Sequence, residues 1–188
     1  MLSTEIREAT KDAHQSLEKQ VVLRLKNIRS NADYAALLKF FYAYFNGLEE
    51  ALKPYITAEV LPDYGARRNS GFLKNDIEAL GSNTTDLPGA AIPEITNHLQ
   101  ALGALYVMEG SIMGGGIIVK MLEKAGVTQG VSFFSGYGEA TPQMWGAFTA
   151  VLNQQATSTS EKETVINTAN ETFNQFQKMF EVHAETVL

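Results

Sequence analysis

One apolar stretch, residues 102–122, constrains the fold more than any other part of the chain. It reads LGALYVMEGSIMGGGIIVKML and carries five glycines although it is apolar around almost its whole circumference. Apolar residues flank it at helical spacings, Pro93 stands where a first-turn proline is common, and Gly126 stands where a C-terminal cap is common. We therefore expect a long helix. Each interior glycine costs about 1 kcal/mol relative to alanine, so another group is expected to approach the bare backbone.

The glycines form a strip, because Gly103, Gly110 and Gly114 fall within about 40° of one another on a helical wheel. Ser111 and Gly115 lie beside them. A phosphate-binding loop does not fit, since no Lys-Ser or Lys-Thr pair follows and no strand precedes. A membrane dimer is disfavoured by a charge in mid-segment and by the lack of a polybasic flank. Close packing of another helix and contact with a flat ligand both remain open.

Composition is that of an ordinary globular protein, with 188 residues, 45% hydrophobic and 19% charged. We expect one domain spanning residues 1–188. The net charge of −6 argues against nucleic acid or an anionic membrane as partner. The absence of cysteine excludes thiolate metal sites, iron–sulfur clusters and disulfides. Residues 1–18 are charged throughout and lack the apolar core of a signal peptide, so a cytoplasmic location is expected.

The remaining segments predict further helices. An apolar stripe runs from Leu2 to Leu17, with Ser3 or Thr4 as its cap. Helices are also expected from a Ser30–Asp33 capping box to Leu52, from residue 71 to 80, and from Thr141–Pro142 onward. A capping box at Ser160 and Glu163 is expected to start the last helix. No strand alternation is convincing, so the fold class is all-α, with about six to eight helices.

The first helix also carries the best candidate ligand. On its wheel, Arg7, Lys11 and Glu18 project close to His14. Two cations beside a neutral imidazole suit a ligand that brings both a metal and its own negative charge. The other histidines, His98 and His183, have simpler interpretations as a surface residue and a packed or helix-end residue. No Glu-x-x-His pair, HExxH motif or nucleophile elbow is present, so demanding chemistry would require a cofactor.

These segments resemble the haem oxygenase family. Residues 6–19, IREATKDAHQSLEK, resemble its proximal-helix motif, and residues 102–122 resemble its distal helix. SFFSGYGEATPQMWGAF and the later ETFNQF look like the bacterial branch often associated with biliverdin supply to phytochromes. The resemblance covers most of the chain. It implies an all-α bundle in which haem lies between the first helix and a kinked, glycine-rich distal helix.

The resemblance also implies roles for individual residues. His14 would bind the haem iron on the proximal side with Glu18 near it, and Phe173 would wall the pocket. Arg7 would contact a haem propionate, while Lys11 and Lys178 are weaker matches for that role. On the distal side, the residues that would contact the haem are Gly110, Gly114 and Gly115. The residues that the match implies for the reaction itself are Gly110, Ser111 and Gly114.

Two distal positions depart from relatives: Ser111 stands where animal enzymes have an aspartate, and Ile112 where some bacterial enzymes have an asparagine. The implied reaction is dioxygen-dependent cleavage of haem, at once cofactor and substrate, to biliverdin, carbon monoxide and ferrous iron. A separate ferredoxin, flavodoxin or reductase would supply electrons, and another protein could accept biliverdin. Exposed cations are candidate contacts for such partners: Arg67, Arg68, Lys120 and Lys124. The alternatives are a haem-binding or storage protein without turnover and a silent structural domain.

Overall fold

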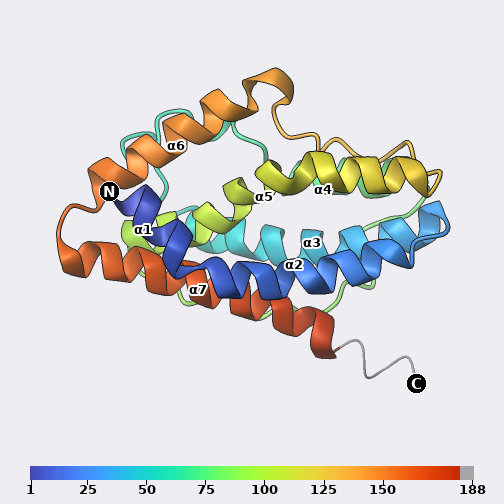
Figure 1. Ribbon diagram of the computed structural model, residues 1–188, viewed down its shortest axis with the longest axis horizontal. Helices are drawn as coiled ribbons and strands as arrows, with labels where there is room; N and C mark the ends of the chain where they lie inside the picture. The colour runs from blue at the N-terminus through green and yellow to red at the C-terminus, as the bar shows by residue number, and fades with distance from the viewer. Residues whose placement is uncertain (183–188) are drawn as a thin grey trace.

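The computed structural model describes residues 1–182, and this part of the chain is all-α (Figure 1). Seven α-helices and two short 3-10 turns make it up, in agreement with the all-α prediction. In chain order they are α1 (Leu2–Ala9), α2 (Lys11–Lys26), α3 (Asn31–Leu52), η1 (Tyr64–Ala66), α4 (Ser70–Ala79), α5 (His98–Lys124), η2 (Gly138–Ala140), α6 (Thr141–Gln155) and α7 (Thr159–Val182). His183 lies outside the described residues.

The predicted glycine-rich helix is α5. It ends just before Gly126, as predicted. Gly126 adopts φ +82°, and Val127 N donates to Leu122 O at 2.9 Å, which is the bonding of a glycine-capped helix end. The start is not at Pro93. Asn97 is the N-cap, because its side chain accepts from Gln100 N. A capping amide satisfies an orphan N–H, which a proline upstream does not.

Two other predicted helix starts are wrong in detail. The first helix is divided at Thr10 into α1 and α2, and the side chain of Thr10 donates to Ile6 O at 2.7 Å. The helix begins at Leu2, after Met1, without a side-chain cap from Ser3 or Thr4. Helix α7 starts at Thr159 after a capping box in which Ser158 and Glu161 exchange hydrogen bonds. The capping box therefore lies two residues earlier in the chain than predicted.

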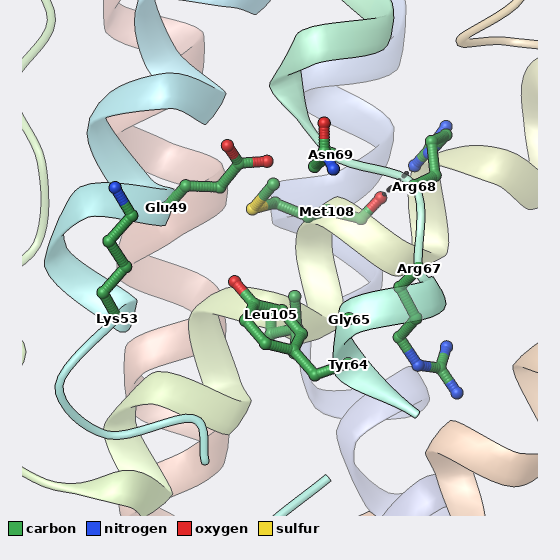
Figure 2. Close-up of a pocket in the computed structure, with 9 residues that line it drawn as sticks. All are labelled: Glu49, Lys53, Tyr64, Gly65, Arg67, Arg68, Asn69, Leu105 and Met108. Atoms are coloured by element: carbon green, nitrogen blue, oxygen red, sulfur yellow. Dashed lines mark hydrogen bonds between the residues drawn. The ribbon is translucent and has the colours of Figure 1, made fainter. Parts of the chain in front are cut away.

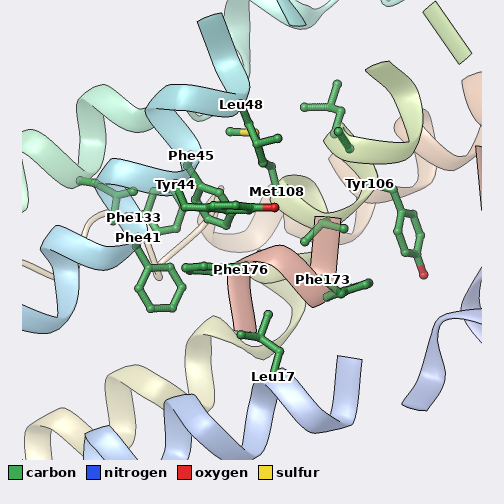
Figure 3. Packing of buried hydrophobic residues seen from close by; sticks show 14 of the residues in the cluster. Leu17, Phe41, Tyr44, Phe45, Leu48, Tyr106, Met108, Phe133, Phe173 and Phe176 are labelled. Atoms are coloured by element: carbon green, nitrogen blue, oxygen red, sulfur yellow. The ribbon is translucent and has the colours of Figure 1, made fainter. Parts of the chain in front are cut away.

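An aromatic cluster forms the centre of the core (Figure 3). Phe41 and Phe45 from α3 meet Phe176 from α7 with ring centroids 5.0 and 5.3 Å away, respectively. Phe133, from the loop before α6, packs against Phe45 at 5.7 Å. The rings of α3 and α7 recur at helical spacing, whereas Phe133 comes from a loop. The cluster ties α3, α7 and the loop to one another.

Helix α5 is long and apolar enough to cross a membrane by length and composition, but more than half of its apolar stretch is buried within the protein. This burial is that of a core helix. Figure 1 shows that its two halves do not share one straight axis, and that the second half (yellow) runs above α2 (blue). The space between these two helices is where the functional site lies.

Candidate functional site

A cavity of about 580 Å³ lies between α2 and the second half of α5. Helix α7 contributes Phe173 and Phe176 to it, α3 contributes Phe41, and α6 contributes Trp145. Its volume falls within the range of small-molecule and cofactor sites, which are mostly apolar with a few polar groups. The cavity therefore has the size and lining of a site for a large, mainly apolar ligand.

His14 lies on the α2 wall of the cavity. Its ring stacks on that of Phe173, with centroids 5.2 Å apart and planes inclined by 25°. The His14 side chain is exposed, whereas Phe173 is only 6% exposed. A buried ring behind an exposed imidazole limits the rotamers of the imidazole and keeps it toward the cavity.

The glycines of α5 divide into two groups. Gly110 and Gly114 line the cavity, and a Cβ added at Gly114 would meet nothing within 4 Å. At Gly110 such an atom would lie 3.7 Å from the Trp145 ring. Gly103 and Gly115 instead face protein, since their added Cβ atoms would lie 2.4 Å from Val165 O and 2.0 Å from Phe134 O. Gly103 and Gly115 therefore serve close packing, whereas Gly110 and Gly114 face the cavity.

The prediction for Gly115 as a cavity residue is wrong in placement. Gly115 is buried and does not line the cavity. One residue corresponds to 100° of helix rotation, so Gly115 points well away from the face that Gly114 presents. It permits the close approach of the Phe134 backbone. Gly116 is exposed, with nothing within 4 Å of an added Cβ, and lines no part of the cavity.

Charged side chains gather at the mouth of the cavity on the α1 and α2 side. Arg7, Lys11 and Glu18 all line it and all are exposed. Lys178, the cation expected from the last helix, is exposed but does not line the cavity. The cations that the structure brings to the cavity therefore come from the first two helices, and no lysine or arginine of the described part of α7 joins them.

A buried polar network lies behind α5, and the sequence interpretation missed it. Arg67 Nη1 bonds Glu109 Oε2 at 2.6 Å, and Tyr137 OH donates to the same carboxylate at 3.1 Å. Arg67 and Arg68 are 3% and 5% exposed, so their predicted role as surface contacts for a partner is wrong. Glu109 was the available signal, because a charge inside a buried apolar run requires a partner.

The sequence comparisons identify the family. The haem oxygenase family model matches residues 1–182. The chain belongs to the haem oxygenase family. A haem oxygenase of Xanthomonas campestris is 30% identical over 145 residues, which cover 76% of this chain and 86% of that protein. Haem oxygenase PigA of Pseudomonas aeruginosa is 24% identical over 177 residues, or 92% and 87% of the two chains.

The fold is also that of a solved haem oxygenase. The Neisseria meningitidis enzyme, studied with NO and CO bound, superposes with a TM-score of 0.82 at 20% identity, over 97% of this chain and 91% of that one. These relatives are bacterial, as the resemblance implied. The further association with phytochrome pigment supply stays a prediction.

For a haem oxygenase, the fit of haem can be tested on the cavity itself. Met113 and Ile117 line it and are 54% and 65% exposed, which is unusual for large apolar side chains on a core helix. A flat apolar ligand would cover them, and the bare backbone at Gly114 leaves room for it. Among the described residues no cluster of three or more His, Asp or Glu could hold a metal ion. The residues present fit haem, with His14 as the available nitrogen ligand.

Ser111 and Ile112, the two residues that differ from those of relatives, lie in different surroundings. Ser111 lines the cavity, and its hydroxyl accepts from Arg68 Nη2 at 2.8 Å. Ile112 is buried and lines no part of the cavity, since it packs beneath Gly136. The residue beside Ser111 on the chain is thus a core residue, and the polar character of the distal wall comes from Ser111 and the arginine behind it.

Proposed function

We propose that this chain cleaves haem with dioxygen and external electrons to biliverdin, carbon monoxide and ferrous iron. The observation that carries the proposal is the pairing of walls in one cavity: an exposed imidazole on α2 and the bare backbone of α5 at Gly110 and Gly114. A planar ligand needs one side that offers a metal ligand and another that lets it approach closely. Haem supplies the redox and oxygen chemistry when it is bound.

In this proposal the chain's own residues bind and orient. His14 would ligate the iron, and the stacked ring of Phe173 would keep the imidazole in place. Arg7 and Lys11, exposed at the cavity, would bind the propionates, and water would still screen these contacts. Gly110 and Gly114 allow the distal backbone to approach the haem face, and apolar side chains around them exclude bulk water from it. Glu18 lies on the same wall and is proposed to orient His14.

The chain carries no flavin or nicotinamide fingerprint, so we propose that a separate redox protein delivers electrons. A ferredoxin, a flavodoxin or a reductase would serve. Lys120 and Lys124 are exposed on α5 and are proposed to contact such a partner. Transfer of biliverdin to an acceptor protein and a cytoplasmic location are part of the same proposal.

A haem titration tests the ligand assignment. We expect a Soret band with stoichiometric haem, and a shifted or weakened band in His14→Ala, because the nitrogen that would bind the iron is lost. The matched control is His98→Ala, since His98 is half-buried at the start of α5 and does not line the cavity. A Soret band that is the same in His14→Ala and wild type would contradict the role of His14.

Turnover separates an oxygenase from a haem-storage protein. The haem complex is supplied with ascorbate or a reductase system in air, and biliverdin absorbance is followed together with carbon monoxide release. We expect loss of the Soret band with growth of biliverdin. Haem that stays intact under these conditions would refute the oxygenase proposal and leave a binding protein.

A further inference from the structure

Asp76 is a buried acid on α4 that does not line the main cavity, the one between α2 and α5. Its side chain is 3% exposed. Oδ1 accepts from Ser132 N at 3.0 Å and from Ser132 Oγ at 2.7 Å, and Oδ2 accepts from Phe133 N at 2.8 Å. No lysine, arginine or histidine within residues 1–182 forms an ion pair with it. These three hydrogen bonds therefore compensate the burial of the carboxylate.

The residues that Asp76 binds begin a single helical turn. Ser135 N donates to Val131 O at 2.9 Å, and we call these five residues the 131–135 turn. The first N–H groups of a helical turn have no carbonyl partner within it. Asp76 supplies the acceptors that an N-cap side chain provides in an ordinary helix. The chain is also fixed just before the turn, because Tyr34 OH of α3 donates to Gly130 O at 2.9 Å.

Helix α4 is itself held against α3 at its first residue. Glu49 of α3 accepts from Ser70 N at 2.5 Å. A second cavity, of about 220 Å³, is lined by Glu49 and by Asn69, the N-cap of α4. Figure 2 shows the Glu49 side chain extending from α3 toward Asn69. The position of Asp76 is therefore fixed by α3, the helix that also carries rings of the central aromatic cluster.

The 131–135 turn also contacts α5 and the main cavity. Phe134 O lies only 2.0 Å from the position of a Cβ added at Gly115, and Phe134 lines the cavity. Gly136, which follows the turn, packs on Ile112 of α5. Gly114, the glycine open to the cavity, directly precedes Gly115. Successive residues of a helix point in directions 100° apart, so the contact at Gly115 determines where Gly114 faces.

The hydrogen bonds to Asp76 fix something that ring packing does not. The rings of Phe133 and Phe134 are buried, but apolar burial is not directional. Hydrogen bonds depend on direction. Three of them from two consecutive residues to one carboxylate orient the 131–135 turn, and the Phe134 carbonyl is part of that turn.

We propose that Asp76 is a positioning residue of the haem site: by holding the 131–135 turn against Gly115, its carboxylate sets the rotation of α5 at which Gly114 faces the haem. The inference rests on the proposed function where it concerns haem, whereas the link from Asp76 to Gly115 concerns the protein alone. Glycines weaken a helix from within, so this half of α5 depends on an external contact to fix its rotation.

A double-mutant cycle on the haem-free protein tests the link to Gly115. Asp76→Asn keeps the side-chain volume but replaces one carboxylate oxygen by an amide nitrogen, which cannot accept from an N–H. Urea unfolding is measured for wild type, Asp76→Asn, Gly115→Ala and the double variant. A turn released from Asp76 yields to the new methyl, so the drop in urea midpoint caused by Gly115→Ala should shrink to about half or less in the Asp76→Asn background. An equal drop in the two backgrounds would overturn the proposal.

Gly103→Ala is the matched control for this cycle. Its methyl would lie 2.4 Å from Val165 O of α7, which is not part of the 131–135 turn. The midpoint drop that it causes should be the same with and without Asp76→Asn. If the drop shrinks equally at both glycines, Asp76→Asn loosens the whole fold, and the proposal is wrong.

Haem titration then tests the effect on the site. In the Asp76→Asn background the direction of Gly114 is no longer fixed, so the factor by which Gly114→Ala raises the haem Kd should be smaller by about threefold or more. Tyr44→Phe provides a control background, because it removes a buried hydrogen bond to Thr172 O and does not line the main cavity. There the factor should keep its wild-type value. A factor that Asp76→Asn leaves unchanged, or that Tyr44→Phe reduces equally, would refute the positioning role.

Ser132→Ala keeps the test decisive if Asp76→Asn does not fold. It removes only the hydroxyl bond to Asp76 and should reduce both the midpoint drop of Gly115→Ala and the Kd factor of Gly114→Ala. The absence of a reduction in either measurement would overturn the proposal. A protein that takes up no haem at all contradicts the proposed function, and the urea cycle then still decides whether Asp76 holds the turn against α5.

Discussion

Alanine at Gly114 should stabilise the haem-free protein and weaken haem binding, two effects of opposite sign from one methyl group. Gly114 lies inside α5, and an added Cβ would meet nothing within 4 Å. The methyl therefore causes no clash with protein. Replacing an interior helical glycine by alanine contributes about 1 kcal/mol to folding, which corresponds to a rise in Tm of about 2–4 °C for a domain of this size.

The same methyl group should weaken haem binding. Gly114 lines the main cavity, so the methyl occupies space that the haem face needs. Overpacking a fitted site by a methyl typically costs about 1–3 kcal/mol. The haem Kd should then rise by roughly 5- to 150-fold. A phenylalanine at this position is expected to abolish haem binding or turnover while helix content is largely retained.

Gly116 provides the matched control. It lies in the same helix, has nothing within 4 Å of an added Cβ, and does not line the cavity. Gly116→Ala should raise Tm to a similar extent and leave haem affinity unchanged. The assays are thermal unfolding of the haem-free proteins by circular dichroism and haem titration by Soret absorbance. Equal haem affinity in the two alanine variants, or a lower Tm in Gly114→Ala, would refute the assignment of Gly114 to an open distal face.

The remaining predictions concern the groups that hold the cavity walls. Gly115→Ala places a methyl 2.0 Å from Phe134 O, and we expect urea denaturation to show a loss of about 1–3 kcal/mol or more; an unchanged midpoint would contradict this packing. Arg67→Met leaves Glu109 buried without its cation and should cost about 3–5 kcal/mol, partly recovered by Glu109→Gln; no recovery would argue against the pair. For Glu161, hydrogen bonds from the backbone N–H groups of two preceding residues lower the pKa to about 2. Its contribution to stability is therefore present above pH 4.5 and is lost as pH falls toward 2, so Glu161→Gln should flatten the acid-unfolding curve there, and an identical curve would contradict it.

The fold could be predicted because its signals are local. Apolar periodicity located α3 and α5, and Gly126 and the Ser30 cap were identified from residue type alone. The errors lie at helix starts, where several capping residues compete within a few positions. For α7, Ser160 was predicted as the cap in place of Ser158. For α5, Pro93 was predicted to mark the start in place of Asn97. The sequence contains all these candidates, but only the hydrogen bonds formed in the fold distinguish them.

The candidate site was predictable to the extent that it lies on single helices. His14, Arg7 and Lys11 were predicted on one helix face. The structure divides them between α1 and α2 but still brings all three to one cavity. Arg68 could not be found in this way, because its contact with Ser111 joins positions 43 residues apart. A pair of adjacent arginines usually indicates a solvated surface. Burial of both depends on how the segment before α4 packs against α5, and no local pattern reports that packing.

The two interpretations of the glycine strip are parts of one device. Gly103 and Gly115 admit backbone oxygens of α7 and of the loop before α6, at distances that no Cβ would tolerate. These two contacts, twelve positions apart on α5, fix the rotation of the helix about its own axis. Gly114 precedes Gly115, so its direction follows from that rotation, and so does the direction of Gly110, one turn earlier. The glycines that pack against protein therefore determine which glycines remain open to the ligand.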